Sequence, residues 1–407
     1  MPLRSLAVRV AVLVISLLAA APAGAAAFVD SAGRRVNLPD RIERIMPAGP
    51  ASAVFVYVLV PNKLIGWTEP LSRVQRALMP VKFARLRVIG HLGGANPTAT
   101  AADVIRLHPD LIIGYGVLSP PTIALADRIQ QQTGVPYILL DDSIQQMPDT
   151  LRQVGQVVGA GDHGLAVTSY AYHAIEALRG QLLISPATGR PLVYYGRGSD
   201  GLETGLPGSP AAANVDQAGV INVATGLGRG GSVRITRAQL LSWNPQIIVA
   251  QERSFYNALL HDPQWRGLAA VRAKRVYLAP AAPFGWIDAP PGVNRAIGLY
   301  WLSNLFYPDL YQEDLRTIAR EFYQLFYGVA INDRQLEAML RPAEANPGET
   351  RRGANVPLLE AEPPPLPAIP PAGEMPRAPP GGIPGRGGLR GGGAARPPAS
   401  PSPSGTP

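Results

Sequence analysis

The sequence predicts an α/β protein in which two sets of alternating strands and helices are separated by one long helix. Short apolar runs alternate with helical stretches over 28–160 and again over 190–340, and strands spaced in this way pair in parallel. Between the two sets, 162–183 contain no proline and carry apolar residues at helical spacing. This segment therefore predicts a helix of about 20 residues, which would span about 30 Å.

The first set is expected to start with a strand that ends at Met46 and a helix over Ala51–Leu59. A second strand is expected at Leu64–Trp67. The following elements, in chain order, are a helix at Ala101–Leu107, a strand at Leu111–Tyr115, a helix at Thr122–Thr133 and a strand at Tyr137–Leu140.

The second set repeats this alternation. Its expected elements are a strand at Pro191–Tyr195, helices at Val215–Ala224 and Arg237–Ser242, a strand at Ile247–Ala250, a short helix at Pro263–Leu268, a strand at Arg275–Leu278 and helices at Val293–Phe306 and Glu313–Phe326. The segments Asp103–Ile113 and Gln239–Val249 share the order helix, X-Pro, strand. This similarity indicates either a weak internal duplication or two α/β units that obey the same turn chemistry.

The two ends of the chain differ in composition from the middle. Residues 1–27 read as a cleaved secretory signal, because Arg4 and Arg9 precede the apolar run Val10–Ala20 and small residues follow it. We therefore expect a periplasmic protein. Residues 342–407 are rich in proline and glycine and hold few residues that can be buried, so we expect a disordered tail.

Composition excludes several classes of function. The chain has no cysteine, which removes disulfides, thiolate metal sites and cysteine nucleophiles. The net charge of +8 comes almost entirely from arginine, with no basic block interleaved with aromatic residues, so we expect no nucleic-acid partner. The five histidines show no metal-ligand spacing, and neither a G-x-S-x-G elbow nor a dinucleotide fingerprint is present. We therefore expect no enzyme, no resident metal and no cofactor.

Several segments together carry a family resemblance. They are the opening FVDSAGRRVNLPDRIE (28–43), HPDLIIGYG (108–116), the long helix at 162–183 and PFGWIDAPPGVNRAIGLYWLSNLFYP (283–308). In this order and spacing they resemble periplasmic solute-binding proteins of ABC importers for iron–siderophore complexes, haem and cobalamin.

The resemblance implies a fold and a division of the chain. It implies two Rossmann-like lobes, joined by one long rigid helix, with a ligand cleft between the lobes. The implied parts are a lobe at 28–160, the connecting helix at 161–184 and a second lobe at 185–341. It also implies a monomer whose partners are a metal chelate and an inner-membrane permease.

In that family, one acidic residue on each lobe docks on the permease, seven positions before the proline of the X-Pro-strand unit. The corresponding residues here are Ala102 and Ala238, so both carboxylates are missing. We expect the neighbouring residues Asp103, Arg237 and Gln239 to give an altered contact.

Residues in loops that follow predicted strands are candidates to bind the ligand, because α/β proteins bind ligands at the carboxyl ends of their strands. Arg197, which lies between two glycines, is a candidate for a carboxylate, catecholate or oxyanion, with Tyr195 and Glu203 beside it. Arg253 is a similar case.

The aromatic candidates have packing in the core as their alternative. Trp67 and Trp286 are expected to stack on a planar ligand, and Tyr115 offers a phenol at a glycine-flanked strand end. Glu69 can pair with a cation.

Three functions remain open from the sequence. The first is a receptor that delivers an iron–siderophore or similar metal chelate to an ABC permease. The second keeps the fold but binds cobalamin, haem or an oxyanion such as molybdate. The third, suggested by the missing docking acids and the long tail, is a periplasmic ligand sensor outside transport.

Overall fold

The computed structural model describes residues 27–184, 189–310 and 314–340, which form an α/β fold with parallel sheets. A short antiparallel hairpin comes first, formed by β1 (Ala27–Val29) and β2 (Arg35–Asn37). The signal segment and the tail lie outside the described residues, apart from Ala27. The predictions for them therefore stay predictions.

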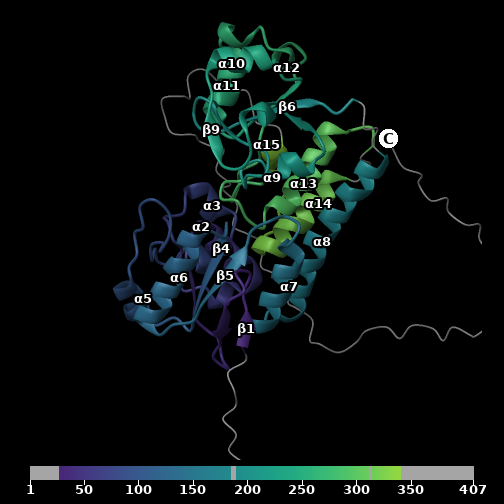
Figure 1. Cartoon of the computed structure of the whole chain (residues 1–407). Helices are drawn as coiled ribbons and strands as arrows, with labels where there is room; N and C mark the ends of the chain where they lie inside the picture. Colours follow the sequence, from purple (N-terminus) through teal and green to yellow (C-terminus); the bar gives the residue numbers. More distant parts are fainter. Residues whose placement is uncertain (1–26, 185–188, 311–313, 341–407) are drawn as a thin grey trace, which may run out of the picture. The chain divides into compact units, whose positions relative to one another are not determined.

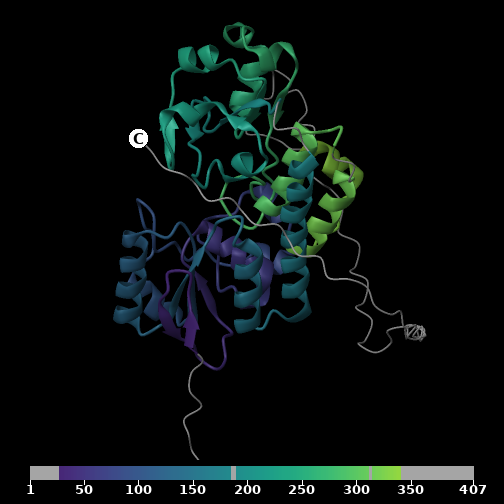
Figure 2. The same cartoon turned by 45° about the vertical axis from the view of Figure 1, so that its right-hand side comes forward.

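The first parallel sheet has the order β3-β4-β5, formed by Ile45–Pro47, Leu111–Gly116 and Tyr137–Asp141. Its strands are almost continuously apolar, as expected for a parallel sheet that is covered on both faces. Figure 2 shows helices on both sides of this sheet. The helical elements of this half are α2 (Pro50–Leu59), η1 (Pro61–Lys63), α3 (Arg73–Ala77), α4 (Val81–Ala84), α5 (Ala101–Leu107), α6 (Pro120–Thr133) and α7 (Met147–Val157).

The second parallel sheet has the order β11-β10-β6-β8, formed by Val276–Leu278, Ile247–Ala250, Leu192–Gly196 and Ile221–Asn222. A separate antiparallel pair joins β7 (Glu203–Gly205) to β9 (Ser232–Arg234). The helical elements up to β11 are α9 (Ala213–Gln217), η2 (Val223–Leu227), α10 (Arg237–Trp243), α11 (Arg253–His261), η3 (Pro263–Trp265) and α12 (Ala269–Arg272).

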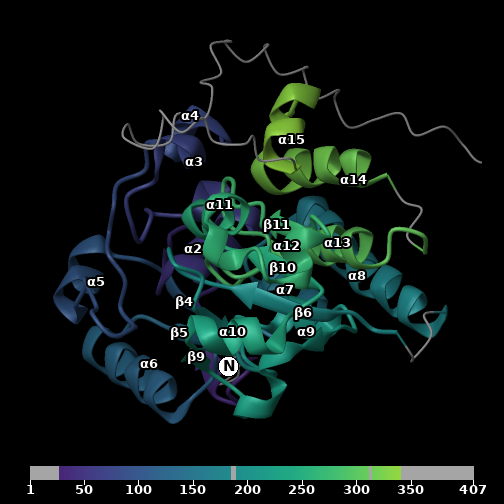
Figure 3. The same ribbon diagram turned by 90° about the horizontal axis from the view of Figure 1, so that it is seen from above.

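The long helix α8 (Gly161–Ile184) packs against α7 and against α13 (Arg295–Phe306), as Figure 1 shows. The last elements are α14 (Leu315–Phe322), the π-helical turn η4 (Tyr323–Tyr327) and α15 (Asp333–Leu340). Ion pairs from Arg316 to Glu337 and from Arg320 to Asp333 join α14 to α15, and the two helices lie side by side in Figure 3.

The helices α5 and α10 are built in the same way. Thr100 and Thr236 cap their amino ends, each accepting a hydrogen bond from the backbone N–H three residues later. His108 and Asn244 end them in the left-handed conformation, with φ of 46° and 45°. A proline and a strand of a parallel sheet follow in both cases, so the similarity seen in the sequence extends to the caps.

Two predicted elements are wrong. Leu64 and Trp67 each form only an isolated parallel bridge, to Ile45 and Val88, and no strand connects them. The helix predicted over Val215–Ala224 ends at Gln217, because Gly219 adopts φ of +69°. The chain then enters β8, which pairs with β6.

Candidate functional site

The carboxyl edge of the first sheet carries two buried polar side chains. Tyr115, near the end of β4, packs its ring on Phe55 with ring centroids 4.7 Å apart, and its backbone N–H donates to Ser52 Oγ at 2.9 Å. Its hydroxyl has no hydrogen-bond partner within the described part of the chain. Burial raises the pKa of Tyr115 to about 12, although the charge of Arg295 opposes the rise. Asp142 follows β5 directly and is also buried.

The carboxyl edge of the second sheet carries a connected polar network centred on Asp288. This carboxylate accepts hydrogen bonds from Tyr195 Oη at 2.5 Å, Arg197 Nε at 2.6 Å and Gln251 Nε2 at 2.8 Å. Tyr195 lies in β6, Arg197 follows β6, and Gln251 follows β10. Charge-assisted hydrogen bonds of this kind are the strong ones, so Asp288 fixes the geometry of this edge.

Arg197 is held from two sides. Besides Asp288, its Nη1 donates to Glu203 and, at 3.2 Å, to Ser232 Oγ. Burial by itself lowers the pKa of Arg197, but the charge of Asp288 and its hydrogen bond outweigh this and raise it. The guanidinium therefore stays charged at any physiological pH.

One loop, at 279–294, reaches both edges. It runs from β11 to α13 and contributes Asp288 to the second sheet. At its end, Arg295 donates from Nη2 to the backbone carbonyl of Asp142, beside the first sheet. A Cβ added at Gly292 would lie 4.0 Å from Tyr115 Cε1, so the loop backbone also approaches the phenol ring. The two carboxyl edges are therefore connected through a single chain segment.

The structure brings four predicted site residues into this arrangement and leaves four outside it. Tyr115 lies at the first edge, and Tyr195, Arg197 and Glu203 lie at the second. The other four are Trp67, Trp286, Glu69 and Arg253.

The two tryptophans are packed in the core. Trp67 donates from Nε1 to the carbonyl of Phe83 at 2.9 Å, and Trp286 is 0 % exposed, with its ring edge-on to Phe322. Neither side chain is accessible in this structure. A stacking role for them stays a prediction and would require the site to open.

Glu69 lies with Asp103 around a separate surface pocket of about 570 Å³, which His91 also lines. Arg253 is the first residue of α11. In the described part of the chain, neither forms a hydrogen bond or ion pair with the Asp288 network, and their ligand-binding roles stay predictions.

The expected docking residues occupy matching places on α5 and α10. Asp103 accepts hydrogen bonds from the N–H and hydroxyl of Thr100 and pairs with Arg106, and the Thr100 hydrogen bonds lower its pKa. Arg237 is exposed at the first position of α10, and Gln239 occupies its third position. Because Asp103 already serves the helix cap, only part of its charge is available to a partner.

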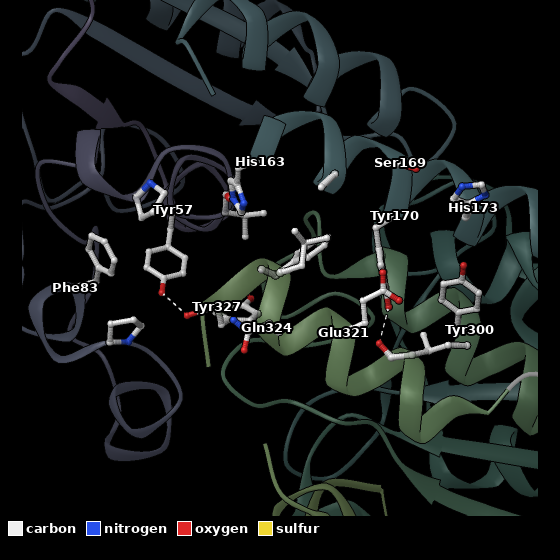
Figure 4. Close-up of a pocket in the computed structure, with 18 residues that line it drawn as sticks. Tyr57, Phe83, His163, Ser169, Tyr170, His173, Tyr300, Glu321, Gln324 and Tyr327 are labelled. Carbon is white, nitrogen blue, oxygen red and sulfur yellow. Dashed lines mark hydrogen bonds between the residues drawn. The ribbon is translucent and has the colours of Figure 1, made fainter. Parts of the chain in front are cut away.

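A larger groove, of about 840 Å³, lies elsewhere. It is lined by the last turn of α2, by one face of α8 and by α14 and η4, and Figure 4 shows its aromatic walls around Tyr57, Tyr170 and Tyr327. The last turn of a helix that follows a parallel strand lies toward the amino ends of the strands. The groove is therefore not at the edge where α/β proteins bind ligands.

Sequence reasoning missed four residues of the arrangement: Asp142, Gln251, Asp288 and Arg295. Asp288 and Arg295 stand in the apolar, proline-rich segment WIDAPPGVNR, where isolated charges are unexpected. That contrast was the available signal. Within the described residues, no group of three or more His, Asp or Glu side chains is arranged to hold a metal ion.

Comparison with known proteins bears on the fold and on the class of protein. Residues 98–283 match the periplasmic binding protein family. The match covers the middle of the chain, from the segment before α5 to the loop that follows β11.

A solved structure extends the similarity beyond the matched residues. An ABC transporter solute-binding protein from Sulfurospirillum deleyianum is 26% identical, with a TM-score of 0.68 over 77% of this chain and 98% of that chain. The matched family and this solved structure are periplasmic binding proteins of ABC transporters, which are binding proteins rather than enzymes, and this chain shares their fold. Among the described residues, no helix has the length and hydropathy needed to cross a membrane.

A relative with a known ligand is also similar. The molybdate-binding protein MolA of Haemophilus influenzae is 24% identical over 323 residues, which cover 73% of this chain and 90% of that protein. The structure of MolA with molybdate bound shares the fold, with a TM-score of 0.63 over 75% of this chain and 99% of that chain.

Proposed function

We propose that the protein binds a small anionic solute where the loop at 279–294 meets the carboxyl edges of the two sheets. The observation that carries the proposal is the convergence of both edges on one loop, which carries Asp288 and is followed directly by Arg295. Arg197 is half-buried there, at 21% side-chain exposure, and stays charged. Asp288 orients its planar group, which suits recognition of a carboxylate, catecholate or oxyanion.

The solute would then be handed to an ABC permease. The family supports this role, and no residue arrangement described above supplies a nucleophile with an adjacent base, as catalysis would require. The altered docking surface around Asp103 and Arg237 indicates a permease whose contacts differ from those of the relatives.

Two classes of solute fit an arginine site. The sequence first indicated an iron–siderophore or similar metal chelate. Similarity to a molybdate-binding protein over 90% of its length favours an oxyanion. The buried state of Trp67 and Trp286 favours the oxyanion as well, since neither aromatic face is open to a planar chelate.

The test is a calorimetric titration of the purified protein with molybdate, tungstate and ferric siderophores. In the Arg197→Ala variant, we expect the affinity for the bound solute to fall at least tenfold, or about 1.4 kcal/mol. Arg234→Ala is the matched control, because Arg234, the last residue of β9, forms an exposed ion pair with Asp200. Unchanged affinity in Arg197→Ala would remove this residue from the site.

A further inference from the structure

The carboxyl edge of the first sheet holds a buried hydroxyl that is not used by the fold. Tyr115 is 5% exposed, and its Oη finds no hydrogen-bond partner among the described residues. Buried polar groups in folded proteins are nearly always hydrogen-bonded, because desolvation without a partner costs free energy. A hydroxyl left in this way is available to a group that is not part of the polypeptide, either a water molecule or a solute.

Arg295 is also buried here, and its guanidinium group makes no direct hydrogen bond to a carboxylate. Its side chain is 1% exposed, and its hydrogen bonds within the described chain go to the backbone carbonyls of Gly292, at 3.2 Å, and Asp142. The paired carboxylate oxygen, Asp142 Oδ2, lies 3.6 Å from Nη2, which is longer than a hydrogen bond. Burial also raises the pKa of Asp142, which favours its neutral form.

The same chain satisfies other buried guanidinium groups differently. Arg34 donates to Asp30 Oδ2 from Nε at 3.0 Å and from Nη2 at 2.7 Å. Arg197 donates to Asp288 at 2.6 Å. In both cases a carboxylate accepts directly, as charge-assisted pairing predicts. Arg295 is more deeply buried than either and lacks this contact.

The phenol and the guanidinium lie close enough for their charges to interact. The positive charge of Arg295 and a side-chain hydrogen-bond interaction with it both lower the pKa of Tyr115 against the effect of burial, so the phenol oxygen faces the guanidinium while the phenol O–H has no acceptor among the described residues. A guanidinium offers only donors, and a phenol hydroxyl can add another. What both groups lack is an acceptor with several oxygens and a negative charge.

We propose that Tyr115 and Arg295 form the anchoring subsite for a compact tetrahedral oxyanion within the anionic-solute site. The proposal rests on the function proposed above and names the class of solute. Oxyanion oxygens accept from both groups at once, and the ion supplies the charge that balances Arg295. Both side chains are almost fully buried, so a solute reaches them only when the loop at 279–294 moves, and a compact oxyanion requires a smaller displacement than a bulky chelate.

The experiment is a titration of the full chain with sodium molybdate and, separately, with a ferric tricatecholate chelate. We expect molybdate to bind and the affinity to fall at least tenfold in Tyr115→Phe and in Arg295→Lys. Because the Tyr115 O–H donates to no acceptor in the described chain, the melting temperature of ligand-free Tyr115→Phe should stay close to that of the parent.

Tyr194→Phe is the matched control. Tyr194 is equally buried in a strand of the second sheet, but its hydroxyl donates to the carbonyl of Gly201 at 2.6 Å. This variant should melt at a lower temperature and bind molybdate with unchanged affinity. The opposite responses of the two variants separate a ligand-binding hydroxyl from a structural one.

Two results would overturn the inference. Molybdate binding that is unaffected in Tyr115→Phe and Arg295→Lys would show that the subsite lies elsewhere. Binding of the chelate but not of molybdate would also reject it, while leaving the anionic-solute function intact. If neither probe binds, and tungstate and other ferric siderophores do not bind either, the proposed function itself fails.

Discussion

Asp288 accepts hydrogen bonds from three side chains that lie at the carboxyl ends of two neighbouring strands of one sheet. Its carboxylate is 1% exposed, so the hydrogen bonds from Tyr195, Arg197 and Gln251 replace all of its hydration. Removing one member of such a buried network leaves the others charged or polar without partners.

Asp288→Ala is therefore expected to lower the free energy of unfolding by about 3–5 kcal/mol. Urea denaturation monitored by tryptophan fluorescence measures it. Asp200→Ala is the control, because Asp200 pairs with Arg234 at the surface, and its loss should cost less than about 1 kcal/mol. Equal effects of the two substitutions would show that the Asp288 network does not stabilise the fold.

Asp142 gives the protein a pH dependence of known sign. Burial raises its pKa above the ordinary value of 3.8, the nearby charge of Arg295 lowers it, and Asp141 raises it further. Between 3.8 and the raised value, the folded state binds more protons than the unfolded state. Stability from this group is therefore present at low pH and is lost as the pH rises through the folded pKa.

Thermal melting across this pH range, at constant ionic strength, measures the effect. In Asp142→Asn, the component that falls with rising pH should disappear, because the amide does not titrate. A profile identical to that of the parent protein would assign the dependence to another group.

At the scale of single residues, the sequence identified Arg197 but not its anchor. Arg197 stood out as a cation between glycines, a local signal. Asp288 is 91 positions away from Arg197 and 37 from Gln251, so its role depends on contacts that only the folded chain makes. Trp67 and Trp286 are buried in this structure, and their binding role stays a prediction, because an aromatic residue after a strand has the same local signal whether it binds or packs.

Among the elements, α13 is positioned by a glycine. A Cβ added at Gly298 would lie 1.9 Å from the carbonyl oxygen of Trp286 and 2.5 Å from Asn214 Nδ2. The helix therefore packs directly on the backbone of the loop that carries Asp288. A side chain at this position would push the two apart.

Gly298→Ala is expected to destabilise the fold by about 1–3 kcal/mol, the usual cost of overpacking, and to weaken solute binding. Gly180→Ala is the matched control on α8, where a Cβ meets nothing within 4 Å. There the gain in helix propensity should stabilise by about 1 kcal/mol. Chemical denaturation of both variants measures their free energies of unfolding. An unchanged free energy of unfolding in Gly298→Ala would contradict the close packing.

Element boundaries were predictable where the chain carries its own cap signals. Thr100 and Thr236 mark the starts of α5 and α10, and the X-Pro pairs mark their ends. At Gly219 the glycine itself was the stop signal, and the helix predicted over Val215–Ala224 ran past it, whereas its left-handed φ ends α9 early. The helices α7 and α11 were missed. Their buried faces, such as Met147, Leu151 and Val154, follow helical spacing, which a quantitative scan for periodicity would detect.

For the molecule as a whole, composition predicts that the segment at 343–407 adds little to folding. It contains few residues that can be buried in a core. Removal of 343–407 should leave the melting temperature nearly unchanged and preserve solute affinity. Calorimetry of the shortened protein beside the full chain tests this, and a large drop in melting temperature would show that the segment packs on the folded part.

The fold class was predictable at this scale because each strand and helix is predicted from its own short segment, and their alternation indicates an α/β fold. The confirmed features are the α/β class, the parallel sheets and the long helix α8. The way the two sheet edges meet was not predictable, because it depends on Arg295 reaching Asp142 across 153 positions.

The loop at 279–294 has a mechanical consequence for the family's mode of action. Asp288 and Arg295 lie seven positions apart on one stretch of backbone. Asp288 is hydrogen-bonded at the carboxyl edge of the second sheet, and Arg295 at the carboxyl edge of the first. Separation of those edges requires the stretch to release one of them, so it behaves as a second tether in parallel with α8. We expect the free energy of that release to determine how often the ligand-free protein opens, and therefore how quickly it binds a solute.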